Sequence, residues 1–165
     1  MREITLHPVA YQEKSVLRQL LELYQYDFSE FTGEEIGPHG FYEYAYLDHY
    51  WTEEDRYPYF IKVNGALAGF ALVNAYTMHI KKGHAVAEFF IMRKYRRGGV
   101  GRQAAALLFD TQRGMWEVNV KASNLVAQKF WNAIITAYTA GDFGEHTLMM
   151  GDAPGQGFHF YAKEE

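Results

Sequence analysis

Apolar residues along the chain follow two different spacings, one typical of helices and one typical of strands. Where an apolar residue recurs every three or four positions with polar residues between, we expect a helix. This spacing predicts helices over about residues 9–26, 100–112 and 125–137, with a weaker one over 41–50. Short, mostly apolar runs predict strands at about 2–7, 58–63, 66–76, 85–92, 116–120, 147–150 and 158–162.

Turn residues between these segments indicate how the strands pair. Asn64-Gly65 separates two apolar runs, which is the strongest short-range signal for an antiparallel hairpin. Residues 27–40 contain three glycines and a proline and are expected to form a loop. The strand over 85–92 is apolar on both faces and is expected at the centre of the sheet. The helix and strand that follow it should complete a parallel crossover.

The predicted elements come in the order of one strand, one or two helices, three strands, a helix, a strand, a helix and two strands. Neither a repeat nor a break in composition interrupts them, so we expect residues 1–165 to form one α+β domain. Its centre should be a mixed, mostly antiparallel sheet of about six or seven strands, flanked by about four helices.

Composition narrows the class of protein. The chain has 165 residues, of which 48% are apolar, enough for the core of one domain. No apolar run reaches the ~18 residues of a membrane span and the N-terminus shows no signal-peptide pattern, so we expect a cytoplasmic protein without a membrane partner. Cysteine is absent, which excludes disulfides, thiolate metal sites and cysteine nucleophiles. The formal net charge of −4 argues against a nucleic-acid partner.

A short loop between the strand at 85–92 and the helix at 100–112 combines basic residues with glycines. It holds Arg93, Lys94, Arg96, Arg97, Gly98, Gly99, Gly101 and Arg102. Glycines let backbone N–H groups close around phosphate oxygens, and the helix that follows adds unpaired N–H groups and its positive dipole end. The loop is therefore an expected phosphate site on an otherwise acidic protein.

Two common phosphate-binding loops fit these residues poorly. A nucleoside-triphosphate loop needs Gly-Lys followed by Ser or Thr, and this chain has Gly101-Arg102. The dinucleotide pattern Gly-x-Gly-x-x-Gly/Ala is met by Gly99, Gly101 and Ala104, but the preceding strand comes late in the chain and no acidic residue ends the next strand. An oxidoreductase that binds NAD(P) at these glycines stays open as an alternative.

The fuller pattern resembles the GCN5-related N-acetyltransferase (GNAT) superfamily. The family's Gln/Arg-x-x-Gly-x-Gly/Ala signature is similar to Arg96-x-x-Gly99-x-Gly101. Its Asn-x-x-Ala-x-x-Phe-Tyr segment is similar to Asn124-x-x-Ala127-x-x-Phe130-Trp131. The order of elements also agrees, over about residues 2–162. The resemblance implies the acyl-CoA N-acyltransferase fold, acetyl-CoA as acyl donor and an amine as acceptor.

The resemblance also implies which residues hold acetyl-CoA. The backbone of Ile91, Met92 and Arg93 would pair with the pantetheine arm like an added strand. N–H groups of the loop would hold the pyrophosphate. Asn124 and one side of the helix predicted over 125–137 would face the thioester end. The implied set is Ile91, Met92, Arg93, Arg96, Arg97, Gly98, Gly99, Val100, Gly101, Arg102, Asn124, Ala127, Phe130 and Trp131. In the family the two strands beside the arm splay apart, a feature that a sequence does not display.

Glu88 is the expected catalytic base. It is the only carboxylate in its strand, and the resemblance implies an acid there that draws the amine proton, with a backbone N–H near Ile91 or Met92 as oxyanion donor. A salt-bridged structural glutamate is the alternative. For the general acid the chain departs from the family, since Trp131 stands where a tyrosine is common and an indole N–H cannot supply a proton. Tyr138 is a candidate, with a packed aromatic as its alternative; otherwise the thiolate takes its proton from water.

The acceptor is expected at the segment 24–60. This segment holds 13 aromatic residues and nine carboxylates. Such a surface suits a cationic amine through ring faces and charge, and Asp27, Glu30, Tyr44 and Trp51 are candidates for contacting it. A solvated acidic surface over a hydrophobic layer, or the contact of a homodimer, is the alternative.

Histidines give no metal prediction. His79 and His84 are five apart, and none of the seven histidines shows a ligand spacing, so no metal is expected. The sequence therefore favours an N-acetyltransferase that moves the acetyl group of acetyl-CoA to a primary, cationic amine of a small molecule or peptide. A non-catalytic acyl-CoA-binding or regulatory module on the same fold is the alternative, favoured by the missing tyrosine.

Overall fold

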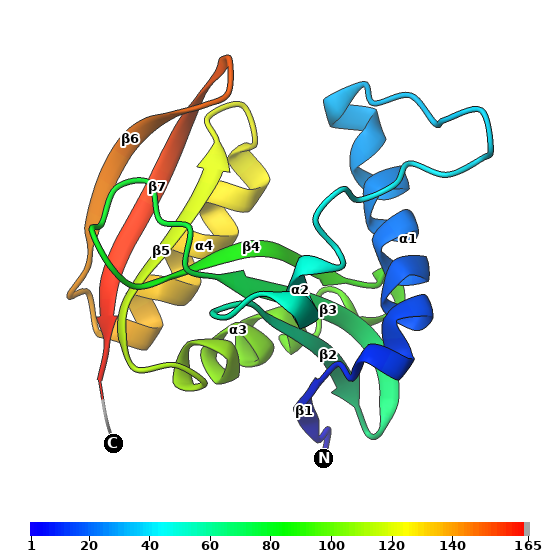
Figure 1. The fold of residues 1–165 in the computed structure, drawn as a ribbon. Helices are drawn as coiled ribbons and strands as arrows, with labels where there is room; N and C mark the ends of the chain where they lie inside the picture. The colour runs from blue at the N-terminus through cyan, green and yellow to red at the C-terminus, as the bar shows by residue number, and fades with distance from the viewer. Residues whose placement is uncertain (164–165) are drawn as a thin grey trace.

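Figure 1 shows a computed structural model of the chain, which describes residues 1–163. One seven-stranded sheet contains β1 (Ile4–Pro8), β2 (Tyr57–Val63), β3 (Ala66–Asn74), β4 (His84–Ile91), β5 (Gly114–Lys121), β6 (Gly144–Met150) and β7 (Ala153–Ala162). The α-helices are α1 (Lys14–Thr32), α2 (His49–Thr52), α3 (Val100–Asp110) and α4 (Leu125–Thr139), with 3₁₀ turns at Tyr11–Glu13 and Arg93–Tyr95. This confirms the predicted α+β class and the predicted order of elements. Within residues 1–163, no helix has both the length and the apolarity that a membrane crossing requires.

The strands lie in the order β1-β2-β3-β4-β5-β7-β6. All neighbours pair antiparallel except β4 and β5, which are parallel and are connected through α3. The predicted hairpin joins β2 to β3, with Asn64 at φ 50° and Gly65 at φ 81°. A tight two-residue hairpin turn of this kind needs positive φ at both positions, which Asn and Gly tolerate best.

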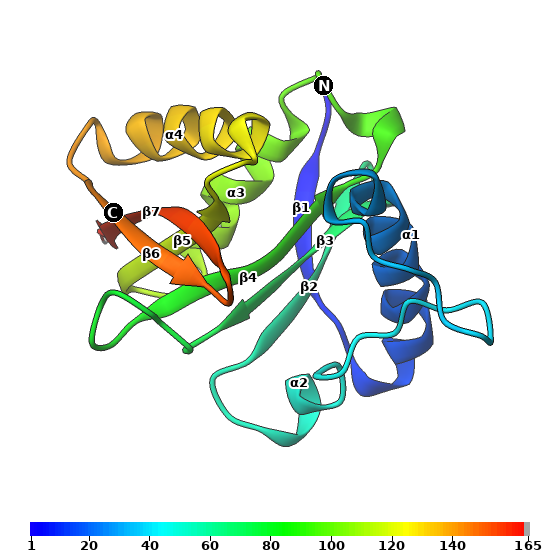
Figure 2. The ribbon, with the colours of Figure 1, turned by 90° about the horizontal axis from the view of Figure 1, so that it is seen from above.

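Helices cover both faces of the sheet (Figure 2). On one face α1 presents Leu17, Leu20 and Leu21, spaced three and four apart, to Phe70 and Leu72 of β3. Full burial of each such side chain contributes about 1.5–3 kcal/mol, so this stripe holds α1 in place. The helix that carries residues 24–32, the first part of the segment 24–60, is therefore fixed against the centre of the sheet.

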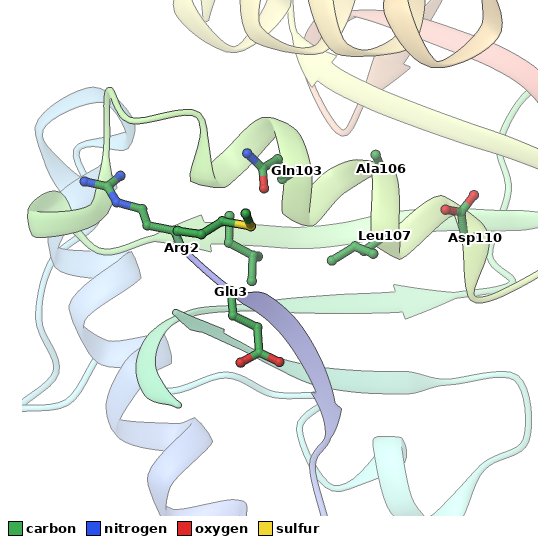
Figure 3. Close-up of a pocket in the computed structure, with 8 residues that line it drawn as sticks. Arg2, Glu3, Gln103, Ala106, Leu107 and Asp110 are labelled. Carbon is green, nitrogen blue, oxygen red and sulfur yellow. The ribbon is translucent and has the colours of Figure 1, made fainter. Parts of the chain in front are cut away.

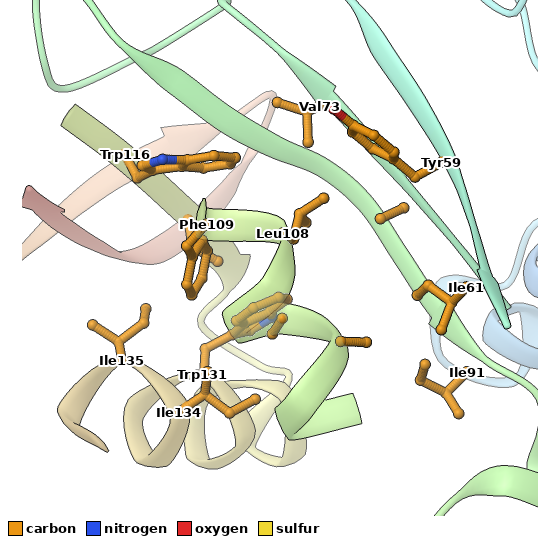
Figure 4. Close-up of a cluster of buried hydrophobic side chains, with 14 of the residues drawn as sticks. Tyr59, Ile61, Val73, Ile91, Leu108, Phe109, Trp116, Trp131, Ile134 and Ile135 are labelled. Carbon is orange, nitrogen blue, oxygen red and sulfur yellow. The ribbon is translucent and has the colours of Figure 1, made fainter. Parts of the chain in front are cut away.

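On the other face, α3 and α4 pack over a core rich in aromatic side chains (Figure 4). Phe109 of α3 lies between Trp116 of β5 and Trp131 of α4, at 5.3 and 6.2 Å between ring centroids. Trp116 also donates from Nε1 to Gln112 O at 2.9 Å, which satisfies its one polar group. This core sets the positions of α3 and α4 relative to β4 and β5.

The first helix is longer than its apolar spacing predicted. We expected a helix over 9–26 and a loop over 27–40, but α1 continues to Thr32 and ends where Gly33 takes a φ of 69°. Tyr24 and Phe28 meet edge to face at 4.8 Å between ring centroids, a contact between neighbours four residues apart that supports the added turns. The predicted loop was therefore wrong over residues 27–32, which are helical.

The helix predicted over 41–50 was also wrong in extent, because only the four residues of α2 are helical. The carboxylate of Glu22 accepts the backbone N–H groups of Tyr42 and Glu43, at 2.8 and 3.2 Å. Glu43 has a φ of 65°. Backbone donors that bond to a side chain of α1 cannot also join a helical ladder, so the segment crosses α1 as a loop.

Candidate active site

Within the described residues, strands β4 and β5 pair only over two residues near their N-terminal ends. The partners are His84 with Trp116 and Ala85 with Glu117, after which β5 continues beside β7. The rest of β4 pairs with β3 on one side, and no β5 residue within 1–163 pairs with it on the other. Figure 1 shows the two strands diverging. An edge of β4 is therefore available to an extended ligand, in agreement with the splay that the family resemblance implied.

Backbone hydrogen bonds indicate which groups of β4 face that edge. The Met92 N–H donates to Ala68 O at 2.8 Å, toward β3. Because successive N–H groups of a strand point to opposite sides, the Ile91 N–H is directed toward the β5 side. Of the two expected oxyanion donors, the geometry favours Ile91, since the N–H of Met92 is already engaged.

The glycine loop leads into a helix start that no side chain caps. Gly99 is the N-cap of α3 with a φ of 79°, and Arg97 has a φ of 65°. Gln103 N–H bonds back to Gly99 O at 3.1 Å, whereas the N–H groups before it are those that a helix leaves unpaired at its start. Left-handed residues in such a loop turn successive N–H groups toward one point, which is the geometry of an anion-binding nest. These residues fit a pyrophosphate.

Two further glycines, one in the loop and one in the first turn of α3, lie close to side chains from other parts of the chain. A Cβ at Gly101 would lie 3.0 Å from the ring of Phe130, so the start of α3 packs closely on α4. A Cβ at Gly98 would lie 2.2 Å from Nη1 of Arg2. Arg2 also lines an open pocket between β1 and α3, beside this loop (Figure 3). Arg2 thus brings a guanidinium group to the loop from a distant part of the chain. For this reason it was not expected there.

A carboxylate of α1 holds two arginines of the loop. Asp27 accepts from Nη2 and Nε of Arg93 at 2.7 and 3.0 Å, and from Nη2 of Arg96 at 2.6 Å. Burial opposes the ionisation of Asp27, but the hydrogen bonds from Arg96 and Arg93 outweigh it and lower the pKa of Asp27. Arg96 Nε also donates to Ile91 O at 2.7 Å. These two side chains position the loop, and Asp27 is engaged by them.

Glu88 lies at a β-bulge of β4. Leu72 of β3 pairs with Glu88, but its successor Val73 pairs with Val86, so Ala87 is an extra residue without a partner on β3. A bulge bends its strand and re-aims the adjacent side chain, which is why bulges occur beside functional groups. Here the bulge lies on the stretch of β4 that has parted from β5.

Two tyrosine hydroxyls donate to the carboxylate of Glu88. Tyr24 OH bonds to Oε2 at 2.5 Å and Tyr44 OH to Oε1 at 3.4 Å. Burial raises the pKa of Glu88, and the hydroxyl donors offset only part of that effect. Burial likewise raises the pKa of Tyr44, and that of the adjacent Tyr50 to about 12, so these hydroxyls keep their protons. The cluster is an acid–base group whose proton affinity is higher than that of an ordinary glutamate.

The residues of α4 that were expected to bind acetyl-CoA lie at the N-cap and in the first two turns of the helix. Asn124 is the N-cap, with Oδ1 accepting from Ala127 N–H at 3.0 Å. Phe130 packs on the first turn of α3. Trp131 is 6% exposed and meets Phe89 of β4 edge to face at 5.1 Å between ring centroids. Trp131 is therefore part of the core between α4 and β4.

Tyr138 is not brought to Glu88. Its hydroxyl donates to Asp110 Oδ1 at 2.6 Å at the end of α3, and its ring packs on Phe109 and Phe160. Burial and Asp110 both raise the pKa of Tyr138. It belongs to the α3–α4 face of the sheet, whereas Glu88 bonds to tyrosines on the α1 face. This placement matches the packed-aromatic alternative.

Of the other acceptor candidates, Tyr44 lies at Glu88 and Glu30 is exposed on α1. Trp51 donates from Nε1 to Val9 O at 2.8 Å and anchors α2. Tyr24 was not among the residues expected at the site. No local signal separates it from the other tyrosines, since its partner lies 64 residues away.

Strands β4 and β5 thus part beside an uncapped helix start, and Glu88 lies on the stretch of β4 that has parted. The sequence matches the family model "Acetyltransferase (GNAT) family" over residues 17–134, more than half of the chain, and the chain belongs to this family. By family, it is an acetyl-CoA-dependent acetyltransferase, which confirms the resemblance seen in its motifs. No curated protein sequence gives a significant match.

Solved structures of acetyltransferases share the fold. An acetyltransferase from Thermus thermophilus is 15% identical, with 96% of each chain covered and a TM-score of 0.69. Spermidine N-acetyltransferase from Vibrio cholerae is 13% identical, with 96% of this chain and 95% of that one covered and a TM-score of 0.66. The ribosomal-protein-S18-alanine N-acetyltransferase from Escherichia coli is 14% identical, with 99% and 96% covered and a TM-score of 0.64.

Proposed function

We propose that the protein transfers the acetyl group of acetyl-CoA to a primary amine, with Glu88 as general base. The observation that carries this proposal is the position of Glu88, at a bulge on the stretch of β4 that has parted from β5. The hydrogen bonds to its carboxylate come from only two neutral hydroxyls, whereas the buried structural glutamate Glu117 accepts from three backbone N–H groups and an amide. A base that retains some proton affinity suits the removal of a proton from an ammonium group.

In this proposal acetyl-CoA lies along the free edge of β4. Its pantetheine arm runs beside the strand, and its pyrophosphate meets the N–H groups at the start of α3. The thioester carbonyl accepts from the Ile91 N–H, which favours the negative charge that develops on that oxygen. Asn124, Ala127 and Phe130 support the arm from the side of α4.

The proposed reaction needs one base and one source of protons. Glu88 removes a proton from the acceptor ammonium, directly or through water, and leaves a neutral amine. The amine nitrogen attacks the thioester carbon, the C–S bond breaks, and the CoA thiolate departs. The nitrogen releases its second proton to water as the amide forms. Because Trp131 replaces the usual tyrosine and Tyr138 is bonded to Asp110, the thiolate takes its proton from water. The products are an N-acetyl amine and CoA.

The acceptor is proposed to be a cationic amine that reaches Glu88 past Tyr24 and Tyr44. The segment around these tyrosines is acidic, with nine carboxylates between residues 24 and 60. A positive charge gains from both the carboxylates and the ring faces. Because solved structures of this fold include enzymes named for spermidine and for the alanine of a ribosomal protein, polyamines and alanine-led peptides head the list of acceptors to test.

Release of CoA thiol in the presence of a panel of amines tests the function. We expect thiol release above background hydrolysis with at least one cationic amine, and acetylated product of the corresponding mass. A protein that binds acetyl-CoA with ordinary affinity but releases no thiol with any amine would instead be the acyl-CoA-binding module. Binding of NADPH without binding of acetyl-CoA would support the dinucleotide alternative.

Substitution of Gly99 tests where the pyrophosphate binds. A Cβ at Gly99 meets nothing within 4 Å, and both Asn and Asp tolerate its positive φ better than other residues do. Gly99→Asp adds a negative charge at the start of α3, and we expect its affinity for acetyl-CoA to fall by at least tenfold in calorimetry. Gly99→Asn has the same shape without the charge and should lose much less. Equal losses in both variants would contradict this placement.

A further inference from the structure

Three histidines from distant parts of the chain meet at one point. His79 lies in the loop between β3 and β4, His146 in β6 and His159 in β7. One ring nitrogen of each lies within 4.8 Å of those of the other two. His79 is exposed, His146 is buried and His159 lies between these extremes. An ion held by these three imidazoles would have protein ligands on one side and solvent on the other.

The tautomer of His146 is set by a chain of hydrogen bonds. The carboxylate of Glu117 accepts from Nδ2 of Asn119 at 2.6 Å, which fixes the orientation of that amide. Asn119 Oδ1 then faces Nε2 of His146 at 2.7 Å and can only accept, so Nε2 carries the hydrogen. The lone pair of His146 is therefore on Nδ1, which faces the other histidines. Metal-binding histidines are commonly oriented in this way, by a carbonyl or carboxylate behind the ring.

Glycines make room for the histidine rings. A Cβ at Gly157 would lie 2.0 Å from Nε2 of His146 and 2.2 Å from Oδ1 of Asn119. A Cβ at Gly144 would lie 2.2 Å from Nε2 of His159. No other residue type fits at either position while the rings stay where they are. The sequence thus places glycine in two strands, where it is ordinarily unfavourable, at the points where the histidines need space.

We propose that His79, His146 and His159 bind a divalent transition-metal ion, of which Zn²⁺ is the best match to three imidazoles and an open fourth position. Nδ1 of His146 and Nδ1 of His159 are 2.9 Å apart and share one proton. Two nitrogens bound to one tetrahedral ion stand about 3.3 Å apart, so the pair opens only slightly to admit it. The ion takes the place of the hydrogen on Nδ1 of His159, and that ring stays neutral by taking up a hydrogen on Nε2 from solvent.

Binding also requires one ring to turn. His79 stacks on His146 with ring centroids 4.1 Å apart and 5° between the planes, and parallel rings do not aim their lone pairs at one ion. Because His79 is exposed, its side chain can rotate out of the stack. Its backbone N–H stays bonded to Glu117 at 2.9 Å, so the loop keeps its position during that rotation.

None of the three histidines is among the residues proposed to bind acetyl-CoA or to act on the amine. Its ligands join the loop after β3 to the hairpin of β6 and β7, so a bound ion would tie these segments together. No metal was expected from the sequence, because the three histidines are far apart in the chain. Positions 79, 146 and 159 become neighbours only because β7 lies between β5 and β6. A hydrogen-bonded histidine pair that merely fills space is the alternative, and the experiment below distinguishes the two.

Titration of tag-free, chelator-treated protein with Co²⁺ and with Zn²⁺ tests the proposal. We expect one ion per chain by calorimetry, and visible Co²⁺ absorption typical of a low-coordinate imidazole site. His79→Ala should weaken binding by at least tenfold, and it should fold because the side chain is exposed. His39→Ala, which removes an exposed histidine from the loop after α1, is the matched control and should bind as the parent does.

Metal affinity that is the same in His79→Ala and His39→Ala would overturn the proposal, and so would the absence of a one-to-one complex in the parent. His146→Gln provides a second test, with circular dichroism to confirm that it folds; retained stoichiometric binding in the folded variant would also overturn the proposal. The measurement uses neither acetyl-CoA nor an amine. Its outcome is therefore independent of whether the protein acetylates amines.

Discussion

Glu88 and Glu117 lie on the same face of the sheet, but different groups donate hydrogen bonds to their carboxylates. Glu117 pairs across the strands with Ala85, three residues before Glu88 on β4. Its neighbours on β5, Trp116 and Val118, belong to the core under α3 and α4. Because side chains alternate along a strand, Glu117 faces the α1 side of the sheet, as Glu88 does.

The two carboxylates have pKa values displaced in opposite directions. Glu117 accepts three successive backbone N–H groups, from residues 78–80 at 2.7–2.9 Å, and the amide of Asn119. Burial opposes its ionisation, but these bonds lower the pKa of Glu117. Glu88 has only two hydroxyl donors, one at 3.4 Å, and burial raises its pKa. The number of donors therefore distinguishes a fixed anion from a base.

The largest expected effect comes from neutralising the base. Glu88→Gln keeps the shape of the side chain but cannot accept a proton, so we expect kcat to fall by about 10²- to 10⁴-fold. The affinity for acetyl-CoA should stay within about twofold, because the donor edge of β4 is unchanged. Steady-state kinetics and calorimetry measure the two quantities, and Glu145→Gln on the exposed part of β6 is the control. A kcat like that of the control would remove Glu88 from the mechanism.

Neutralising the other carboxylate should affect stability rather than catalysis. Glu117→Gln replaces one accepting oxygen with an NH₂ group that faces backbone donors, and hydrogen bonds to a charged acceptor contribute about 1.5–3 kcal/mol each. We expect the free energy of unfolding at pH 7 to fall by about 3 kcal/mol in urea denaturation. Activity per folded molecule should change little. Glu145→Gln again serves as control, and an unchanged midpoint would show that these bonds contribute no net stability.

The smallest effect is a difference in how stability depends on pH. The pKa of Glu117 is lowered by folding, so its contribution to stability is present above its unfolded pKa and is lost as pH falls through the folded value. The pKa of Glu88 is raised, so stability falls as pH rises from the unfolded toward the folded value. Urea midpoints of the two Gln variants should therefore deviate from the parent in opposite directions at neutral pH and converge with it in acid. Deviations of the same sign would contradict the assigned shifts.

The sequence predicted what is locally encoded. The Asn64-Gly65 hairpin and the glycine loop before α3 were predicted because each depends on residues adjacent in the chain. The same holds for Asn124, whose cap bond to Ala127 spans three residues. These features cover the donor side of the site, which explains why the sequence indicated the donor clearly.

The parts that residue patterns did not predict depend on distant partners. The divergence of β4 from β5 was implied only by the family resemblance, because it follows from how β5 pairs with β7 and no local pattern records it. Tyr138 was a plausible acid from its distance along α4, but the helix places it over Asp110 on the opposite face of the sheet from Glu88. The identity of Tyr24 as a donor to Glu88 needed α1 to be docked first.

One turn of α1 joins the acceptor side of the molecule to the donor loop. Tyr24, which donates to Glu88, and Asp27, which holds Arg93 and Arg96, are three residues apart and so adjacent on the helix surface. If the donor phosphates bind the guanidinium groups that Asp27 holds, a donor that drew one arginine away would also loosen the turn that carries Tyr24. Occupancy of the donor site and protonation of Glu88 would then be thermodynamically linked. By reciprocity, an acceptor that displaced Tyr24 would change how tightly the donor is held.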